Sequence, residues 1–373
     1  MCTESCDVDV DNYKLRVLHA GSYQSNRSLA RYLHHKKMAR LFAEGARTSE
    51  APDIIIAGLP IHYCAYEAVR FGNEKGIPVI VDLRDYWPDI FLSMFPKGLQ
   101  WLGRVLLRRD FRITRTALRN ATSIVSMMSR MLEWGLKDYA GRSRDSNDQV
   151  FFIGGDPPGI GRVEKVGELF PGLVEKSRGR FVVNYIGGFG HFTHPTVIIH
   201  AAKYLQSIGC HEVLFLLAGN GDFHARCVKA AEGLDNVIFL GWLDTDGIEA
   251  LNSISSAGVI PSVEEYSFPN KAFSYLGGGL PIFSSEHGEL KSLLEKYQAG
   301  FYFDISDPVQ LAKKILEVSR LDAESYRRVS DNAKSLFRDH LRADDIYRRY
   351  ADYVENVARQ YGDQARNVVT QVA

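Results

Sequence analysis

Long apolar runs are missing from this chain of 373 residues, and no segment approaches the roughly 20 apolar residues that a membrane-spanning helix needs. The first residues also lack the charged-then-apolar pattern of a secretory signal. Cysteine is scarce, and its five positions are odd in number without metal-ligand spacing: Cys2, Cys6, Cys64, Cys210 and Cys227. We therefore interpret the cysteines as free thiols in a reducing compartment and expect a cytoplasmic location.

Net charge is also absent, since 45 Lys and Arg residues balance 45 Asp and Glu residues. The charge is unevenly distributed, however. Residues 1–150 contain 22 basic and 17 acidic residues, whereas the remainder contains 23 and 28. A basic half beside an acidic half favours contact of the first half with something anionic, although a bias of this size also arises by chance.

Strand-like apolar runs alternate with helical stretches, which predicts an α/β protein whose parallel sheets are covered on both faces. The first series of expected strands is Leu15–His19, Asp53–Ala57, Pro78–Asp82, Ser123–Met127 and Val150–Ile153. The second series is Phe181–Ile186, Val213–Ala218, Val237–Leu240, Gly258–Pro261, Pro281–Ser285 and Gly300–Phe303. A segment rich in Gly, Pro and charge separates the two series and predicts a hinge at 156–179.

Two doubly wound, Rossmann-like domains are therefore expected, one over 1–155 and one over 180–340. Ligands bind open parallel sheets at the carboxyl ends of the strands, so we expect a cleft between the two domains.

Residues 264–285 are the most informative stretch: a loop, a short helix, a glycine turn and a strand. Pro269 cannot occupy a helix interior, so the helix begins at or just after it. The unpaired N–H groups of the first turn, together with Lys271, then form a site for an anion such as a diphosphate. An ordinary loop–helix–turn is the alternative for any one of these residues alone.

Taken whole, this stretch resembles the donor-site motif of nucleotide-sugar-dependent glycosyltransferases of family four. The order of elements over about residues 15–355 is similar to the GT-B architecture of these enzymes. The resemblance implies that the second domain holds the nucleotide-sugar and the first holds the acceptor. It also implies a C-terminal helix over 341–373 that packs back on the first domain.

The resemblance implies donor contacts from four loops, each of which otherwise serves only as a turn. The first contains Gly187, Gly188, Phe189, Gly190 and His191. The second contains Gly219, Asn220 and Gly221, and the third contains Trp242 and Leu243. Trp242 either stacks near the base or covers the edge of the core. The fourth loop and its helix contain Tyr266, Ser267, Phe268, Pro269, Asn270, Lys271 and Ser274.

The family signature is a Glu, seven intervening residues and a second Glu that holds the ribose hydroxyls. Tyr266 and Ser274 occupy these two positions here, with Glu264 and Glu265 close to the first but not on it. A Ser hydroxyl can still bond a ribose hydroxyl, although without the strength of a charged acceptor.

Residues 79–89 end an expected strand and resemble the Arg-Asp-x-Trp-Pro segment of bacterial surface-polysaccharide glycosyltransferases. The resemblance implies that Arg84 lies near the reacting sugar. Arg84 stays protonated and cannot act as a base, but it can stabilise the leaving phosphate, while Asp85 orients Arg84 or the acceptor hydroxyl. The alternative is a structural Arg–Asp pair that caps the strand.

One expected helix, at 98–119, carries five arginines spaced by four, four, three and four residues, which places them on one face: Arg104, Arg108, Arg112, Arg115 and Arg119. Such a face is either a solvated surface or a docking site for anionic lipid that brings the active site to a lipid-linked acceptor.

Family members open with a strand, a glycine-rich loop, a long helix and a second strand before the region matched by Leu15–His19. Only fourteen residues precede that region here. We therefore expect either a shortened chain or a start inside a longer reading frame.

The resemblance predicts a retaining, metal-independent glycosyltransferase of the hexosyltransferase type. It would move a sugar from a nucleotide diphosphate to a glycan or lipid-linked acceptor in bacterial surface-polysaccharide synthesis, at the inner face of the cytoplasmic membrane. We expect no cofactor, no nucleic-acid partner and no metal, because Asp244 and Asp246 suit a helix cap better than a metal site. The alternatives are a non-catalytic relative that binds only nucleotide or a partner, and a nucleotide-sugar epimerase, for which no acid/base pair of carboxylates is evident.

Overall fold

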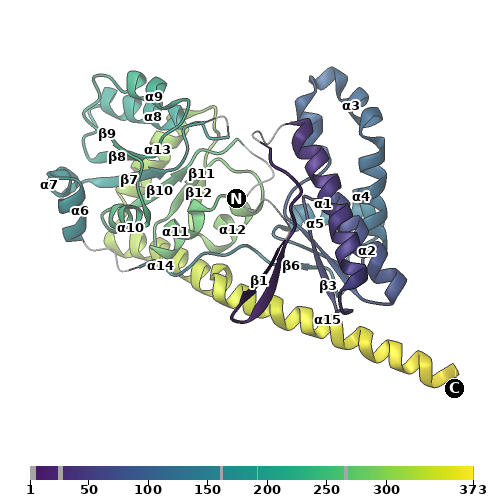
Figure 1. Ribbon diagram of the computed structural model, residues 1–373. Helices are drawn as coiled ribbons and strands as arrows, with labels where there is room; N and C mark the ends of the chain where they lie inside the picture. Colours follow the sequence, from purple (N-terminus) through teal and green to yellow (C-terminus); the bar gives the residue numbers. More distant parts are fainter. Residues whose placement is uncertain (1–5, 24–27, 160–162, 191, 264–267, 373) are drawn as a thin grey trace. The chain divides into compact units, whose positions relative to one another are not determined.

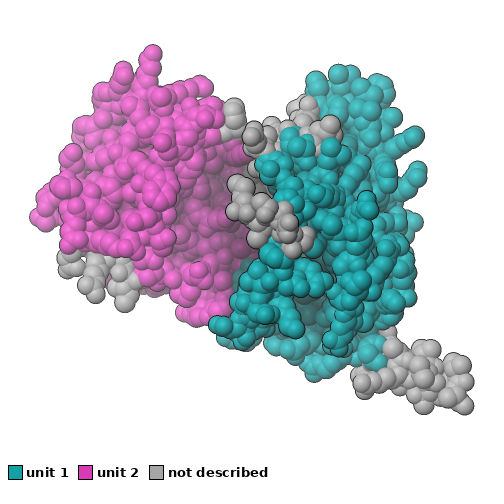
Figure 2. All heavy atoms as spheres, in the orientation of Figure 1, with its two compact units in different colours: residues 1–152, 347–373 teal, residues 153–346 magenta. Residues whose placement is uncertain are grey.

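The computed structural model describes residues 6–23, 28–159, 163–190, 192–263 and 268–372. The chain divides into two compact units, which Figure 2 colours separately. The first unit comprises residues 1–152 and 347–373, and the second comprises residues 153–346. No helix in the described ranges is both long and apolar enough to cross a bilayer.

The second unit is built on a six-stranded parallel sheet with the order β12-β11-β10-β7-β8-β9 (Figure 1). Its strands are β7 (Phe181–Ile186), β8 (Val213–Ala218), β9 (Val237–Gly241), β10 (Ala257–Ile260), β11 (Ile282–Ser284) and β12 (Gly300–Tyr302). All six lie where the sequence predicts strands, within one or two residues at each end. The α/β class with parallel sheets is therefore confirmed.

Helices cover both faces of this sheet. One core joins the sheet to α8 (Thr196–Ser207), α9 (His224–Ala230) and α13 (Pro308–Ser319). The other joins it to α6 (Val163–Leu169), α7 (Leu173–Ser177) and α10 (Thr245–Ser253). Neighbouring residues Val182 and Val183 of β7 enter different cores, which is why the strand is mostly apolar, with Asn184 as its polar residue, instead of alternating. The remaining helices are α11 (Lys271–Gly277), α12 (Glu289–Tyr297) and α14 (Ala323–Leu336).

The first unit contains a four-stranded parallel sheet in chain order: β3 (Ile55–Leu59), β4 (Val79–Leu83), β5 (Ser123–Ser126) and β6 (Gln149–Val150). Helix α2 (His62–Lys75) packs on β3 and on its neighbours α1 (Leu29–Thr48) and α4 (Arg108–Asn120). Two short helices, α3 (Gln100–Leu106) and α5 (Ser129–Glu133), complete the unit.

The last helix, α15 (Ala343–Val372), returns to the first unit (Figure 1). Val357 packs on Ile80 of β4 and Val125 of β5, and the rings of Tyr350 and Tyr353 border the same cluster. The predicted C-terminal helix therefore supplies part of the first unit's core.

The first expected strand forms within two residues of its predicted position, but its assignment to the parallel sheet is wrong. Strand β2 (Tyr13–Val17) pairs antiparallel with β1 (Cys6–Val10) in a two-stranded hairpin that is separate from the parallel sheet. Two features of the sequence explain this: apolar and acidic residues alternate in β1, and Asp11 and Asn12 favour a tight turn. The apolar side chains of the hairpin are exposed, so the hairpin contributes little to the core.

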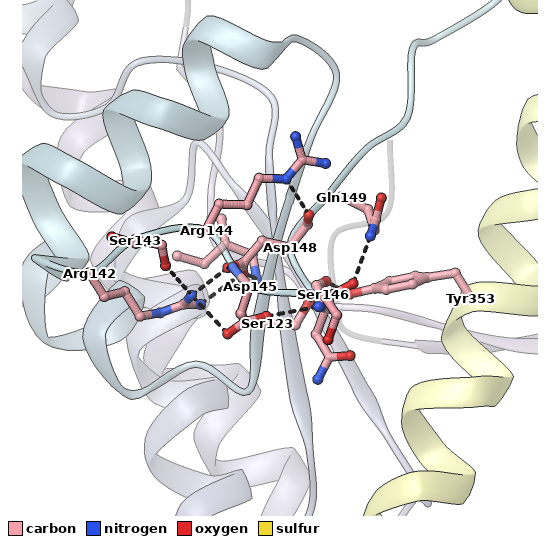
Figure 3. A network of polar contacts seen from close by, with 11 residues as sticks. Ser123, Arg142, Ser143, Arg144, Asp145, Ser146, Asp148, Gln149 and Tyr353 are labelled. Carbon is pink, nitrogen blue, oxygen red and sulfur yellow. Dashed lines mark hydrogen bonds and ion pairs between the residues drawn. The ribbon is translucent and has the colours of Figure 1, made fainter.

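A polar network fixes the loop before β6 to the sheet and to α15 (Figure 3). Asp148 is fully buried and accepts hydrogen bonds from the Arg142 guanidinium (2.8 Å from Nη2) and from the Ile124 N–H of β5 (2.9 Å). On the other side, the Tyr353 hydroxyl donates to the Asn147 carbonyl (2.6 Å). The loop thus bridges a strand and the returning helix.

Two acidic residues of this network allow a matched stability test. Asp145 and Asp148 both pair with Arg142, but Asp145 is exposed. Asp148→Ala leaves a guanidinium and backbone N–H groups without their buried acceptor, so we expect it to lower the free energy of unfolding by about 3 kcal/mol. Asp145→Ala should cost less than about 1 kcal/mol. Urea unfolding measures both, and equal losses would contradict this account of the network.

Candidate functional site

Strand order in the second unit reverses between β7 and β10. From β7 the chain proceeds outward to β8 and β9, and then returns to place β10, β11 and β12 on the other side. Loops that leave the two strands at such a point diverge, and the crevice between them is where open α/β sheets bind ligands. The glycine loop at 187–190 follows β7, and the segment leading to Lys271 follows β10.

Two glycine loops meet backbone to backbone at this edge of the sheet. A Cβ atom on Gly219 would lie 1.9 Å from the Gly187 carbonyl oxygen, and one on Gly221 would lie 2.5 Å from the Phe189 carbonyl oxygen. Both glycines also have positive φ angles, 132° and 148°. These glycines are therefore required by the approach of the two loops and not by the turns alone.

The loop at 187–190 is anchored from below. Phe189 is fully buried, and its ring meets Tyr185 edge-on at 5.4 Å between centroids. The Gly188 carbonyl accepts hydrogen bonds from the hydroxyls of Tyr185 (2.5 Å) and Thr193 (2.6 Å). The side chain of Phe189, a predicted donor contact, thus belongs to the core, which leaves backbone groups as what this loop can offer a ligand.

Lys271 is the first residue of α11, so the helix begins just after Pro269 as predicted. Its Nζ lies 4.5 Å from the centre of the Tyr185 ring, and a Cβ on Gly187 would be only 2.5 Å from it. Burial lowers the pKa of Lys271 to about 8. In the described ranges no carboxylate lies within ion-pair distance of this ammonium group, so it is a partly buried cation without a counter-ion among the described residues.

Ser274, one turn after Lys271, already has a partner. Its hydroxyl oxygen accepts a hydrogen bond from the side-chain amide of Asn252 on α10 (2.7 Å). The Oδ1 of Asn252 accepts in turn from Asn184 of β7 (2.9 Å). Ser274 therefore keeps its O–H proton for a further acceptor. No local sequence pattern indicates these hydrogen bonds, because the residues that they join lie 22 and 68 positions apart.

Trp242, which follows β9, is 75% exposed, whereas Leu243 packs on the core. The alternative in which Trp242 covers the core edge is therefore wrong. Asp244 caps α10, accepting from the Gly247 N–H at 2.8 Å, which confirms the predicted capping role. Asn220 turns its side-chain oxygen to the N–H of Gly221 (2.8 Å).

Part of the main motif lies outside the described residues: His191, Tyr266 and Ser267, with Glu264 and Glu265. Phe268 is buried and stacks on Phe273 at 5.1 Å between centroids, so it anchors the loop to the core. The Pro269 carbonyl accepts the Ala272 N–H (2.9 Å), and Asn270 is the N-cap residue of α11 without a side-chain capping bond. Gly190 leaves open space where a side chain would be.

In the first unit, Arg84 and Asp85 do not pair with each other. Arg84 donates to Asp82 of β4 (2.7 Å), which also accepts from the Tyr350 hydroxyl of α15 (3.2 Å). Asp85 accepts instead from the Tyr86 N–H (2.8 Å) and from the indole N–H of Trp87 (3.1 Å). The Arg–Asp pair at this strand end is therefore Arg84–Asp82, and Asp85 positions Trp87.

A buried polar cluster lies beneath this segment. The ring of Trp87 lies tilted against the ring of His35, at 4.8 Å between centroids, and against the ring of His62, at 6.0 Å. His62 Nε2 and the Tyr63 hydroxyl each lie 2.9 Å from Oδ1 of Asp110, a buried residue of α4. Burial acts to raise the pKa of Asp110, but the hydrogen bonds from these partners outweigh it and hold the pKa below its usual value.

The five arginines do not share one continuous helix, and that expectation is wrong. The helix is interrupted at Leu107, which has φ −92° and ψ 13°, so Arg104 belongs to α3 and the others to α4. On α4 the arginines are exposed, while Asp110, Thr114, Ala117 and Leu118 form the buried face. The basic face thus lies on α4, and Arg104 belongs to a separate helix.

No group of three or more His, Cys, Asp or Glu side chains in the described ranges is arranged to hold a metal ion. Burial raises the pKa of the Cys64 thiol to about 12, so this thiol is inert at neutral pH.

Residues 180–320, which span the sheet of the second unit and the loops above, match the family model "Glycosyl transferases group 1". No curated protein resembles the chain significantly in sequence.

Solved structures resemble the chain over most of its length. HepE of Anabaena, in complex with UDP, is 16% identical, with 86% of this chain and 82% of that chain covered and a TM-score of 0.65. Sucrose-phosphate synthase of Thermosynechococcus elongatus is 14% identical, with 98% and 86% covered and a TM-score of 0.66. The UDP-forming α,α-trehalose-phosphate synthase of Burkholderia vietnamiensis is 10% identical, with 96% and 89% covered and a TM-score of 0.68. At these identities the likeness establishes the fold alone, which is GT-B as predicted.

The approach of the two glycine loops generates a stability prediction. Gly219→Ala places a methyl group against the Gly187 carbonyl at a strained φ, so we expect a loss of at least about 2 kcal/mol in unfolding free energy. Gly188 has nothing within 4 Å of its Cβ position, so Gly188→Ala is the matched control and should cost less than about 1 kcal/mol. Equal urea midpoints for the two variants would rule out the close approach.

The buried cluster of the first unit generates a prediction about acid. Burial, followed by the nearby Arg31, His62 and His34, lowers the pKa of His35 to about 4. In the unfolded chain the imidazole has its ordinary pKa of about 6.5, so between pH 6.5 and 4 the unfolded chain binds more protons than the folded one. The free energy of unfolding therefore falls as the pH falls through that window. His35→Phe should remove about 2 kcal/mol of this loss. Thermal unfolding from pH 7 to 4 measures it, with the exposed His200→Phe as control; parallel curves for wild type and His35→Phe would refute the assignment.

Proposed function

We propose that this protein is a glycosyltransferase that takes its sugar from a nucleotide diphosphate bound to the second unit. The observation that carries the proposal is the partly buried ammonium group of Lys271, held against Tyr185 and Gly187 where the strand order reverses. A diphosphate supplies the negative charge that the described surroundings of Lys271 lack. The match of residues 180–320 to a glycosyl transferase family supports the same assignment.

UDP is the first nucleotide to test, because HepE structures are described with UDP, with UDP and glucose, and with UDP-glucose. In our proposal the backbone of the loops at Gly187–Gly190 and Gly219–Gly221 approaches the donor. Ser274 donates its remaining proton to a ribose hydroxyl. The exposed ring of Trp242 lies at the end of β9, where a base can stack on it.

For the first unit we propose that Arg84 stabilises the leaving phosphate of the donor. Its guanidinium is held at the carboxyl end of β4 by Asp82, which is itself fixed by Tyr350. A fixed cation stabilises developing negative charge without having to reorganise during the reaction. Asp85 acts through Trp87, as a positioning residue. We further propose retention of anomeric configuration without a metal, as in the family that the sequence resembles.

The acceptor in this proposal is a glycan or lipid-linked sugar of bacterial surface-polysaccharide synthesis. The exposed arginines of α4 support a site at an anionic membrane surface, because Arg108, Arg112 and Arg115 have no ion-pair partner in the described ranges. The protein would then work at the inner face of the cytoplasmic membrane.

A second candidate is a non-catalytic relative that keeps the donor fold. The observation in its favour is the bond between Asn252 and Ser274, which occupies part of the position where the family carries a charged Glu. Nucleotide binding without sugar transfer, in a chain that melts cooperatively, would establish this candidate instead.

The proposal predicts nucleotide affinity that depends on Lys271 and on pH. In calorimetric titrations with UDP, GDP, dTDP, ADP and CMP, we expect one nucleotide to bind, and Lys271→Ala to weaken it by at least about tenfold. Since burial lowers the pKa of Lys271 to about 8, affinity should fall as the pH rises from 7 to 9. Lys271→Arg stays charged and should lose this pH dependence.

The control for this titration is Lys203→Ala, which removes an exposed lysine of α8 and should leave nucleotide affinity unchanged. Equal affinity of wild type and Lys271→Ala would refute the donor site. Binding of none of the five nucleotides by a cooperatively melting chain would refute it as well.

A further inference from the structure

Helix α3 exposes nearly all of its large apolar side chains. Trp101 is 63% exposed and Leu106 is 64% exposed. The same helix and the residue before it add three more exposed apolar side chains: Leu99, Leu102 and Val105. Single exposed apolar residues are common on protein surfaces, but five within eight consecutive residues form a patch that requires a partner.

The packing of α3 explains why these side chains face outward. Its buried residue is Gly103, where a Cβ would lie 2.8 Å from the Phe95 ring and 3.1 Å from a Leu92 methyl group. A helix that places glycine against the core and its Trp, Leu and Val residues in solvent has its amphipathic order reversed. The contact at Gly103 therefore keeps the apolar side chains of α3 on the exposed side of the helix.

The charge around the patch identifies the kind of partner. Between residues 98 and 119 the chain carries six arginines and a single acidic residue, Asp110, which is buried. Arg104 lies over the Phe111 ring at 5.4 Å, and the exposed Arg108 and Arg109 begin α4 directly after the break at Leu107. Arg104 also pairs with the partly exposed Asp89 (3.6 Å), so the cations that border the patch without an ion-pair partner in the described ranges are those of α4, such as Arg108 and Arg112. An apolar patch with such cations along its border is complementary to a bilayer with anionic headgroups.

The position of α3 in its unit suits this partner. Figure 1 shows α3 leading into α4 at the end of the first unit that is remote from α15. Its seven residues make a helix about 10 Å long, too short to span a bilayer but suited to lie in its surface. Trp at the boundary between headgroups and acyl chains is a typical interfacial anchor.

We propose that α3 inserts into anionic membranes, with Trp101 and Leu106 entering the acyl boundary while the arginines of α3 and α4 contact headgroups. This deepens the proposed function, on which it rests for its purpose, since a lipid-linked acceptor lies at that surface. It differs from docking by charge alone because high salt then weakens membrane binding without abolishing it.

The test is flotation of the full chain with vesicles of phosphatidylcholine, alone and mixed equally with phosphatidylglycerol. Wild type should bind the mixed vesicles, and the double variant Trp101→Ser/Leu106→Ser should bind them at least about tenfold more weakly. Leu33→Ser is the matched control, because Leu33 is a comparably exposed leucine on α1 of the same unit. It should bind as wild type does.

Tryptophan fluorescence gives a second measurement, which reports on the position of Trp101 even in variants that still bind vesicles. Mixed vesicles should shift the emission of wild type to the blue, and Trp101→Phe should remove that shift while still floating. Equal flotation of wild type and the double variant would overturn the proposal in favour of charge alone. If wild type is a dimer in solution and the double variant is a monomer, the proposal is overturned, because a second copy of the chain then covers the patch.

Nucleotide titration of the same preparations separates this proposal from the donor site. A chain that binds UDP but no vesicle would refute the membrane anchor and leave the donor site standing. Vesicle binding without nucleotide binding would refute the donor site while supporting the anchor.

Discussion

The approach of one backbone loop to another is the constraint on which the candidate site depends. Gly219 and Gly221 allow the loop after β8 to lie directly against the loop after β7, and no residue with a Cβ fits there. That approach settles where Gly187 lies, and Gly187 in turn borders the ammonium group of Lys271. The geometry around the cation is therefore built from main chain, which does not change rotamer. Side chains such as that of Phe189 pack in the core and hold the loop in place.

The fold of the second unit was accessible from the sequence because both faces of its sheet are buried. Strand β8 is then a continuous apolar run and β7 is one apart from Asn184, and each is followed by a turn that requires glycine. The hairpin at the start was not accessible in the same way. Its apolar residues are as numerous as those of a short core strand, and only the Asp11-Asn12 turn distinguishes it. The break at Leu107 left no glycine or proline to reveal it, so one helix was expected where two form.

Partners of the candidate residues were the least predictable part of the site. Arg84 and Asp85 are adjacent in sequence, which suggested a pair, yet each finds another partner within three residues: Asp82 and Trp87. In an extended segment successive side chains point in opposite directions, so neighbours seldom pair. Ser274 and Asn252 show the converse, because tertiary structure joins residues that no local pattern connects. Lys271 was found because its proline-bounded helix start is a local feature.

The chain enters the second unit after Phe152 and leaves it after Ile346, so the first unit is assembled from both ends of the sequence. A ribosome finishes the whole second unit before it makes the helix whose Val357 covers Ile80 and Val125. During that interval the sheet of the first unit presents an apolar face without its own cover, while the second unit, being contiguous, can complete its fold. The order of synthesis thus makes the first unit the later one to mature. A message that ends early, near residue 346, would yield a finished second unit and a first-unit sheet that lacks its covering helix.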